Sequence, residues 1–193
     1  ATDPMVSMHS PFPQLVTPRL TLRQILPQDV DALYAIHSDR DWMQWYGVEP
    51  ITERYEAIQL AEMFVSWHAA GSGFRWGLER RDDGRLIGTC GLFRWNKSWC
   101  NCVIGYEIAP DCSGQGLMLE AVEAILDYGF NDMGLHRVQA ETHPDNLASI
   151  KLATRLGFRF EGVHREQACW GGQFHDLNCY SLLRNEWRER SAA

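Results

Sequence analysis

The part of the chain that decides the fold lies between residues 103 and 158. It reads VIGYEIAPDCSGQGLMLEAVEAILDYGFNDMGLHRVQAETHPDNLASIKLATRLGF. The residues of 103–109 predict a strand that ends at Pro110, and the apolar run from Leu117 predicts a helix that Gly134 ends. Residues 137–142 predict a second strand. A strand, a helix and a strand this close together favour a parallel pair with a right-handed crossover.

The loop between the first strand and its helix, residues 111–116, reads DCSGQG. Backbone N–H groups at a helix N-terminus have no partner within the helix, and the helix dipole gives that end partial positive charge. Gly114 and Gly116 carry no Cβ, so a phosphate can approach the backbone closely. The loop is therefore a candidate pyrophosphate site, although a G-x-G pattern on its own is more often a tight turn without a ligand.

A second helix follows the second strand and makes the combination more specific. Residues 143–158 read HPDNLASIKLATRLGF. Asp145 or Asn146 can cap this helix, and Gly157 stands where a left-handed residue commonly ends one. The loop, the helix, the strand and this capped helix together form a much more restrictive pattern than the two glycines.

The main structural alternative is a dinucleotide site of the Rossmann type. Its fingerprint requires a third glycine, and Leu119 occupies that place. Glu141, at the end of the next strand, could imitate the acidic residue that binds the ribose. The missing glycine makes this alternative the weaker one.

The chain from Thr17 to Leu183 resembles the GNAT acetyltransferases, and within them the RimJ/RimL branch of ribosomal-protein N-terminal acetyltransferases. The resemblance implies an α+β (mixed α/β) GNAT fold. In that fold a central mixed sheet of six to seven strands is flanked by about four helices, and the two central parallel strands splay apart. The motifs that carry the resemblance are the IGYEI strand, the SGQGLM loop followed by Glu120-Ala121, the NxxSI…LGF helix, Glu161-Gly162, and Asp176 shortly before Tyr180.

The resemblance implies acetyl-CoA as the cofactor, with its pantetheine arm between the splayed strands and its pyrophosphate on the loop. The family loop usually starts with Arg or Gln, but Ser113 stands there in this chain, which shifts cofactor binding toward backbone N–H groups. Asn146 is either a contact to the pantetheine arm or only a helix cap. Lys151 and Arg155 either meet the adenosine phosphate or form a solvated face. By this resemblance the cofactor-binding residues are Ile104, Tyr106, Ile108, Ser113, Gly114, Gln115, Gly116, Leu117, Met118, Asn146 and Ser149.

The resemblance also implies where the catalytic acid lies. Many GNAT enzymes use a tyrosine in the second helix to protonate the departing thiolate, and Ala153 occupies its place in this chain. The RimL-like branch instead uses the serine of NxxS, which is Ser149. The usual glutamate base of that branch aligns with Ala168, so a substitute is expected.

Three residues near the expected cleft are candidates for the general base: Glu107, Glu141 and His143. Each could equally be a solvated residue at the end of a strand, and for Glu141 that is the favoured interpretation. Glu107 lies on the splayed strand beside the expected position of the sulfur. Glu107 and Ser149 are therefore the predicted catalytic residues.

Composition narrows the class of protein. The 193 residues carry a net charge of −7, which argues against a nucleic-acid partner and suits a cationic substrate. No apolar run is long enough to cross a membrane and no signal-peptide pattern opens the chain, so we expect a cytoplasmic protein without a membrane partner. The six cysteines contain no C-x-x-C pair and the seven histidines show no metal-ligand spacing, so we expect free thiols and no metal site. The sequence leaves a homodimer open.

The remaining segments predict one domain over residues 17–190, after a loose segment over residues 1–16. Alternation and turn signals predict strands at 19–25, 74–79, 85–93, 159–169 and 173–183, and helices at 28–38 and 52–70. We expect substrate contacts in these two helices and in the last hairpin, where aromatic residues gather. The aromatic residues are Trp42, Trp45, Tyr46, Trp67, Trp95, Trp99 and Trp170.

We therefore expect an acetyl-CoA-dependent N-acetyltransferase of a primary amine, most simply the N-terminal α-amino group of a (ribosomal) protein. Only a neutral amine attacks a thioester. An α-amino group has a pKa near ~8 and is about a tenth neutral at pH 7, whereas a lysine side chain is neutral at well under ~0.1%. The α-amine thus needs only a modest base. Two alternatives stay open: an acetyltransferase of a small amine (an amino acid, a polyamine or an amine antibiotic), and a catalytically silent acyl-CoA-binding module.

Overall fold

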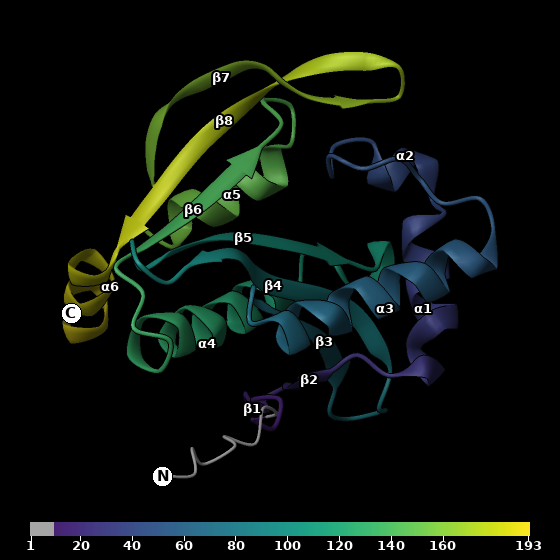
Figure 1. Cartoon of the computed structure of the whole chain (residues 1–193), viewed down its shortest axis with the longest axis horizontal. Helices are drawn as coiled ribbons and strands as arrows, with labels where there is room; N and C mark the ends of the chain where they lie inside the picture. The colour runs from purple at the N-terminus through teal and green to yellow at the C-terminus, as the bar shows by residue number, and fades with distance from the viewer. Residues whose placement is uncertain (1–9) are drawn as a thin grey trace, which may run out of the picture.

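One mixed sheet organises the structure, which is a computed structural model that describes residues 10–193 (Figure 1). Within these residues eight strands lie in the order β1-β2-β3-β4-β5-β6-β8-β7, and β5 and β6 are the parallel pair. The strands are β1 (Leu15–Val16), β2 (Leu20–Gln24), β3 (Phe74–Arg80), β4 (Leu86–Asn96), β5 (Asn101–Ile108), β6 (Arg137–Thr142), β7 (Arg159–Trp170) and β8 (Gln173–Leu183).

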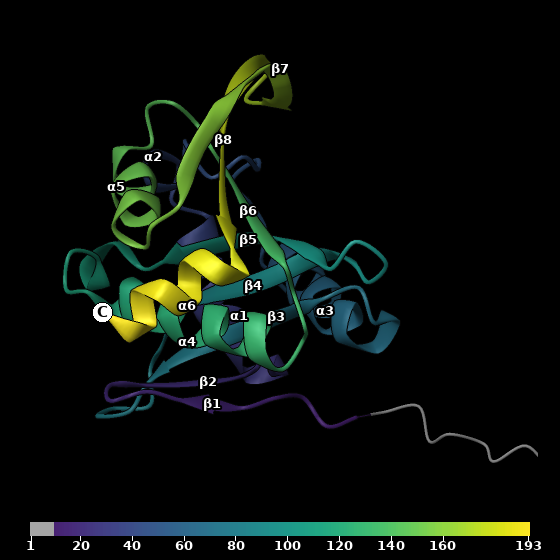
Figure 2. The ribbon, with the colours of Figure 1, turned by 90° about the vertical axis from the view of Figure 1, so that its left-hand side faces the viewer.

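Helices cover both faces of this sheet (Figure 2). The helices α1 and α3 pack together on one face, where Phe64 of α3 lies against Arg75 of β3. On the other face Tyr128 of α4 contacts Trp76, because successive side chains of a strand point to opposite faces. The described helices are α1 (Val30–His37), α2 (Arg40–Met43), α3 (Arg54–Ala70), α4 (Leu117–Asn131), α5 (Leu147–Arg155) and α6 (Arg184–Ala192), with 3-10 turns at Pro27–Asp29 and Pro110–Cys112.

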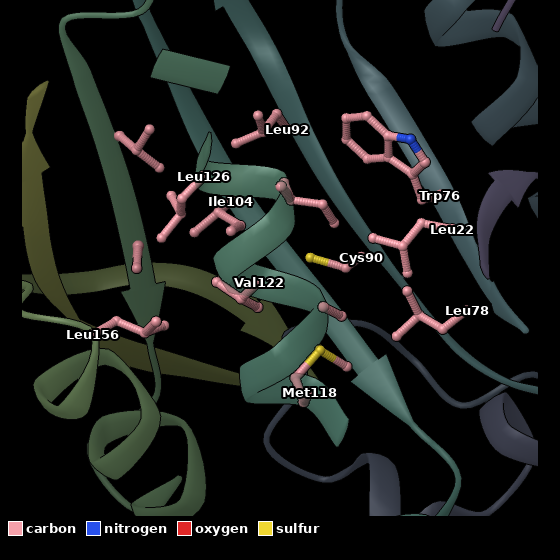
Figure 3. Close-up of a cluster of buried hydrophobic side chains, with 14 of the residues drawn as sticks. Leu22, Trp76, Leu78, Cys90, Leu92, Ile104, Met118, Val122, Leu126 and Leu156 are labelled. Carbon is pink, nitrogen blue, oxygen red and sulfur yellow. The ribbon is translucent and has the colours of Figure 1, made fainter. Parts of the chain in front are cut away.

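The larger part of the core lies between the sheet and α4 (Figure 3). Leu78 and Leu92 from the strands and Val122 and Leu126 from α4 are almost completely buried there. Burying side chains of this size contributes about 1.5–3 kcal/mol each. This packing fixes the position of α4, and therefore the position of the loop that precedes it.

Acidic residues of α4 hold the segment before β2 and the helix after β8 against α4. Glu120 forms an ion pair with Arg19, which lies just before β2, at 2.9 Å. Asp127 accepts a hydrogen bond of 2.7 Å from Trp187 Nε1 of α6, and Glu123 pairs with Arg190 of the same helix at 2.8 Å. The segments before β2 and after β8 are thus both fastened to the helix that carries the glycine loop.

The two parallel strands separate halfway along their length. Their pairing runs from Asn101 opposite Arg137 to Ile104 opposite Ala140 and then stops. Beyond that point β5 stays with β4, up to Ile108 opposite Gly88, and β6 stays with β8, up to Thr142 opposite Asn178. The predicted splay is confirmed, and it leaves a gap between β5 and β6.

The predicted fold class is confirmed, but the sheet has one strand more than the predicted maximum and there are two additional helices. The extra strand is β1, since Leu15 and Val16 pair with β2. These two residues fall within the segment predicted to be loose, of which residues 1–9 lie outside the described residues. The helix α2 has four residues, too few to show a period, and the mostly polar α6 buries Trp187 but has no apolar face.

Among residues 10–193, no helix combines the length and the apolar character that crossing a bilayer requires.

Candidate active site

Three cavities follow one another along the gap between β5 and β6. The first, of about 400 Å³, lies between the N-terminus of α4 and α5, and we call it the loop cavity. The second, of about 80 Å³, is the junction, where the strands separate. The third, of about 430 Å³, lies between β5, the α2–α3 region and the β7–β8 hairpin, and we call it the aromatic cavity. Tyr46 and Tyr106 line all three, so the cavities form one path.

The α4 end of the loop cavity has the features of an anion site. Gly116 is the N-cap of α4, and Gly114 and Gly116 have φ angles of +75° and +77°, a left-handed conformation that glycine adopts without strain. The N–H of Glu120 donates to the carbonyl of Gly116 at 3.1 Å, so the N–H groups before Glu120 in α4 have no acceptor within the helix. A Cβ at Gly114 would meet nothing within 4 Å. The loop therefore fits a pyrophosphate.

The edge of β5 beyond Ile104 offers backbone groups to an extended ligand. The Ala109 N–H donates to the Ile87 carbonyl of β4 at 2.7 Å. Because backbone groups alternate in direction along a strand, those of Tyr106 and Ile108 point to the opposite side, into the gap. Trp42 Nε1 donates a hydrogen bond of 2.7 Å to the Ile108 carbonyl, which is therefore already paired. The peptide groups of Tyr106 are thus the ones best placed to pair with a pantetheine arm.

The predicted cofactor-binding residues come together around the loop cavity and the junction, with one exception. Gln115 is turned away from both, because its side chain donates to the Asp111 carbonyl at 3.2 Å and its own carbonyl accepts from Arg19 at 2.9 Å. Lys151 and Arg155 of α5 also line the loop cavity. The predicted residues that line these two cavities are Ile104, Tyr106, Ile108, Ser113, Gly114, Gly116, Leu117, Met118, Asn146 and Ser149.

Ser149 lies where the loop cavity meets the junction. Its hydroxyl is 2.5 Å from the hydroxyl of Tyr106, and its N–H donates to Asn146 Oδ1 at 3.2 Å. Asn146 is thus the cap of α5 and lines the cavity as well. Burial raises the pKa of Tyr106, against the opposing effect of its hydrogen bond with Ser149. The phenol therefore keeps its proton at neutral pH.

Glu107 is buried in a network of polar groups beneath the aromatic cavity. Its carboxylate forms an ion pair with Arg75, accepts a hydrogen bond from Thr89, and lies 3.2 Å from His37 Nε2. Burial alone would raise the pKa of Glu107, but the charge of Arg75 and the contacts with His37 and Thr89 outweigh it and hold the pKa at about 2. A carboxylate this strongly stabilised in its ionised form is a poor proton acceptor.

Glu141 is the carboxylate that lines both the junction and the aromatic cavity on the β6 side. Its Oε1 accepts a hydrogen bond of 2.9 Å from Gln139 Nε2 and lies 3.6 Å from Arg94. Ala168, the residue aligned with the usual glutamate base, lines the same cavity. The aromatic cavity therefore lacks that glutamate but holds another one nearby.

His143 also lines the aromatic cavity. Its Nδ1 accepts a hydrogen bond of 3.0 Å from the Asp145 N–H, so the neutral ring carries its proton on Nε2. Burial lowers the pKa of His143; His175 lowers it further by a smaller amount, and Asp145 acts in the opposite direction. Its ring stacks on Trp45 with 4.3 Å between the centroids. His143 is thus a neutral donor at Nε2 rather than a base.

Aromatic side chains from distant segments form the walls of this cavity. Of the aromatic residues predicted to contact the substrate, Trp45, Tyr46, Trp67 and Trp170 line this cavity. Trp170 Nε1 donates to the Gln44 carbonyl at 2.9 Å, which holds the β7–β8 hairpin against the segment after α2. Trp95 and Trp99, which belong to the same predicted set, do not line this cavity: Trp95 packs against Phe74, and Trp99 is 76% exposed.

Several residues of the site escaped the sequence analysis. Glu107 is held by three residues from different elements, namely Arg75 of β3, Thr89 of β4 and His37 of α1. No local sequence pattern connects these elements. The hydroxyl pair of Tyr106 and Ser149 spans two elements that meet only in the folded chain. The hydrogen bond from Trp42 Nε1 to the Ile108 carbonyl was likewise not predicted.

Comparison with known proteins gives the class. A family model described as an acetyltransferase (GNAT) domain matches residues 19–159. The uncharacterized N-acetyltransferase YoaA of Bacillus subtilis (strain 168) is 38% identical over 173 residues, which cover 90% of this chain and 98% of that protein. The ribosomal protein uS5-alanine N-acetyltransferase of Escherichia coli (strain K12) is 30% identical over 182 residues, 92% of this chain and 94% of that protein. The crystal structure of a probable acetyltransferase has a TM-score of 0.82 at 25% identity, covering 90% of this chain and 98% of that one.

The class that the family model and the fold define is an enzyme that transfers an acyl group from coenzyme A. The chain belongs to the GNAT acetyltransferase family, and within it to the RimJ/RimL-like branch. It is an N-acetyltransferase that uses acetyl-CoA. The loop cavity is the part of the path that fits this cofactor.

Proposed function

We propose that this enzyme acetylates the N-terminal α-amino group of a protein, which enters through the aromatic cavity and reaches the junction. One observation carries the proposal: Ser149 and Glu141 both line the junction, Ser149 from the side of the loop cavity and Glu141 from the side of the aromatic cavity. A proton donor and a proton acceptor thus flank one small space. Acetyl-CoA supplies the acetyl group there as an activated thioester.

In this proposal Glu141 removes the proton from the amine. The amine nitrogen must lose a proton to become nucleophilic, and a positioned carboxylate can accept it directly or through one water. Gln139 fixes the orientation of the Glu141 carboxylate. Glu107 is the less suitable base because Arg75 holds it ionised, and His143 because its acceptor nitrogen is already occupied.

Ser149 supplies the proton on the opposite side of the junction. Because the phenol of Tyr106 stays protonated, it can donate to Ser149 Oγ across their 2.5 Å separation. As the amine nitrogen bonds to the acetyl carbon and the bond from that carbon to the sulfur of coenzyme A breaks, the serine proton would pass to the departing sulfur. Tyr106 is thus proposed to orient the Ser149 hydroxyl, and Ser149 to be the acid.

The lining of the aromatic cavity favours an α-amine over a polyamine. A polyamine carries several cations along one chain, and each buried cation needs an acidic partner. The carboxylates of this cavity are Glu49, Glu107 and Glu141. Arg75 neutralises Glu107, and Arg94 lies near Glu141. A protein N-terminus brings a single ammonium group next to apolar and peptide surface, which suits Trp45, Trp67 and Trp170.

The proposal is tested by measuring thiol release from acetyl-CoA with a panel of amines, with acetyl-CoA binding measured in parallel. The panel contains short peptides with free N-termini, the same peptides with blocked N-termini, free amino acids, spermidine and an aminoglycoside. We expect kcat/KM for a free-N-terminus peptide to exceed that for spermidine by about a hundredfold, and blocked peptides to give only background hydrolysis. Faster turnover with spermidine or the aminoglycoside would contradict the proposal, as would acetyl-CoA binding without acetylation of any peptide.

A further inference from the structure

A cluster outside the three cavities ties the start of β2 to the glycine loop. Glu120 Oε2 accepts hydrogen bonds from Thr17 Oγ1 at 2.6 Å and from the Arg19 N–H at 2.9 Å. Glu120 Oε1 accepts from Arg19 Nε at 2.9 Å, and Arg19 Nη1 donates to the Gln115 carbonyl at 2.9 Å. One arginine, about a hundred residues away in sequence, therefore holds both the loop and the first turn of α4.

The bond to Gln115 fixes the orientation of one peptide group of the loop. In a trans peptide the C=O of one residue and the N–H of the next point in opposite directions. The Gln115 carbonyl points at Arg19, so the N–H of Gly116 points away from Arg19. A Cβ at Gly116 would lie 3.4 Å from Arg19 Nη2, so the guanidinium lies directly behind the loop. Gly116 also lines the loop cavity, so an N–H that points away from Arg19 can face that cavity.

The bond to Glu120 removes a charge conflict. Glu120 is in the first turn of α4, close to the place where a pyrophosphate would lie. The carboxylate and the pyrophosphate are both negative, so they would repel each other. Its side chain is 17% exposed and paired with Arg19. Burial alone would raise the pKa of Glu120, but the hydrogen bonds from Thr17 and Arg19 lower it, so the carboxylate is charged and needs the cation. Ser113, at the start of the loop, supplies none.

We propose that Arg19 is a positioning residue of the cofactor site: it sets the Gly116 N–H toward the diphosphate of coenzyme A and neutralises Glu120 beside it. This inference concerns the binding of the cofactor, so it holds whichever amine accepts the acetyl group.

The test measures dissociation constants of three ligands by calorimetry: coenzyme A, dephospho-coenzyme A, which lacks the 3′-phosphate, and pantetheine, which lacks the diphosphate, the adenosine and the 3′-phosphate. For Arg19→Ala we expect coenzyme A and dephospho-coenzyme A to bind about tenfold more weakly and by the same factor, with pantetheine unchanged. Lys151→Ala with Arg155→Ala serves as the contrasting variant. These two cations of α5 line the loop cavity and are the candidate contacts of the adenosine phosphate. Their loss is therefore expected to weaken the binding of coenzyme A but not that of dephospho-coenzyme A.

Two further variants separate positioning from folding. Arg19→Lys keeps the charge but replaces the two nitrogens that contact Glu120 and Gln115 by a single one, so we expect it to lose most of the same affinity. Arg19→Ala combined with Glu120→Gln is expected to bind coenzyme A more tightly than Arg19→Ala alone, because the repelling charge is gone. Arg54→Ala, at an exposed ion pair on α3, controls for the loss of a surface arginine. Unchanged coenzyme A affinity in Arg19→Ala, or an equal loss for pantetheine, would overturn the proposal.

Discussion

The hydroxyl groups of Tyr106 and Ser149 lie 2.5 Å apart, one on the splayed strand β5 and the other in the first turn of α5. A hydrogen bond this short joins the two sides of the gap at the point where the loop cavity becomes the junction. The pair links the predicted acid, Ser149, to a strand residue that was predicted only to bind the cofactor.

Ser149→Ala is expected to lower kcat by about a hundredfold while changing KM for acetyl-CoA little, because general-acid groups typically contribute ~10²–10⁴ in rate. Tyr106→Phe should give a smaller loss in kcat, since Ser149 keeps its proton but loses its orientation. Steady-state kinetics on both variants provides the measurement. Ser66→Ala, an exposed serine of α3, is the matched control. A normal kcat in Ser149→Ala would remove this serine from the mechanism.

Glu141→Gln is expected to lower kcat/KM for the amine by about a hundredfold at pH 7. The difference from the unmodified enzyme should shrink as the pH rises above ~8, because the α-amine then loses its proton without help. A pH profile of kcat/KM from 6 to 9.5 measures this. Glu62→Gln, at an exposed carboxylate of α3, is the control for charge. If the ratio of kcat/KM between the unmodified enzyme and Glu141→Gln stayed constant across the pH profile, Glu141 would not act as the base.

Glu107→Gln is expected to destabilise the protein by about 3 kcal/mol at pH 7, because it leaves Arg75 buried without its partner. The folded pKa of about 2 lies below the ordinary 4.5, so ionised Glu107 contributes stability that is complete above about pH 5 and is lost as the pH falls toward 2. The gap in unfolding free energy between the two proteins should therefore narrow at pH 3. Urea unfolding at pH 7, 5 and 3 provides the test. Asp31→Asn, at an exposed pair, should change little at any pH. Equal stability of Glu107→Gln and the unmodified protein would show that the buried network is not a structural element.

Gly105→Ala is expected to weaken the amine and not the cofactor. A Cβ at this position would lie 3.0 Å from Phe93 Cε1 and 3.2 Å from Arg75 Nη1, and both side chains line the aromatic cavity. We expect KM for the peptide to rise several-fold, with the dissociation constant of coenzyme A serving as the internal control. A larger effect on coenzyme A than on the peptide would contradict the assignment of the two cavities.

Sequence patterns located the parts of the site that are local in the chain. The glycine loop, the capped helix with Asn146 and Ser149, and the strand with Tyr106 lie within one continuous stretch, where spacing and capping signals are strong. The splay of β5 and β6 followed from the resemblance that this stretch carries.

The environment of each residue did not follow from the sequence. From the sequence Glu107 is a candidate base, but in the folded chain Arg75, Thr89 and His37 surround its carboxylate. These three partners lie 32, 18 and 70 positions away along the chain. Burial and pairing decide whether a carboxylate accepts protons, and both depend on tertiary contacts. The same reason explains why Gln115 faces away from the cavity: its orientation depends on Arg19, which a loop motif does not contain.

One wall of the aromatic cavity comes from a segment that does not line the loop cavity. This wall is the β7–β8 hairpin, whose tip rests on the segment after α2 through Trp170 and Gly171, whereas the glycine loop, α4 and α5 line the loop cavity. Insertions or exchanges in the hairpin can therefore reshape one side of the path without disturbing the other. Such an arrangement lets a lineage diverge in what it modifies while inheriting its acetyl donor unchanged, and it makes the hairpin the natural place to redirect this enzyme by design.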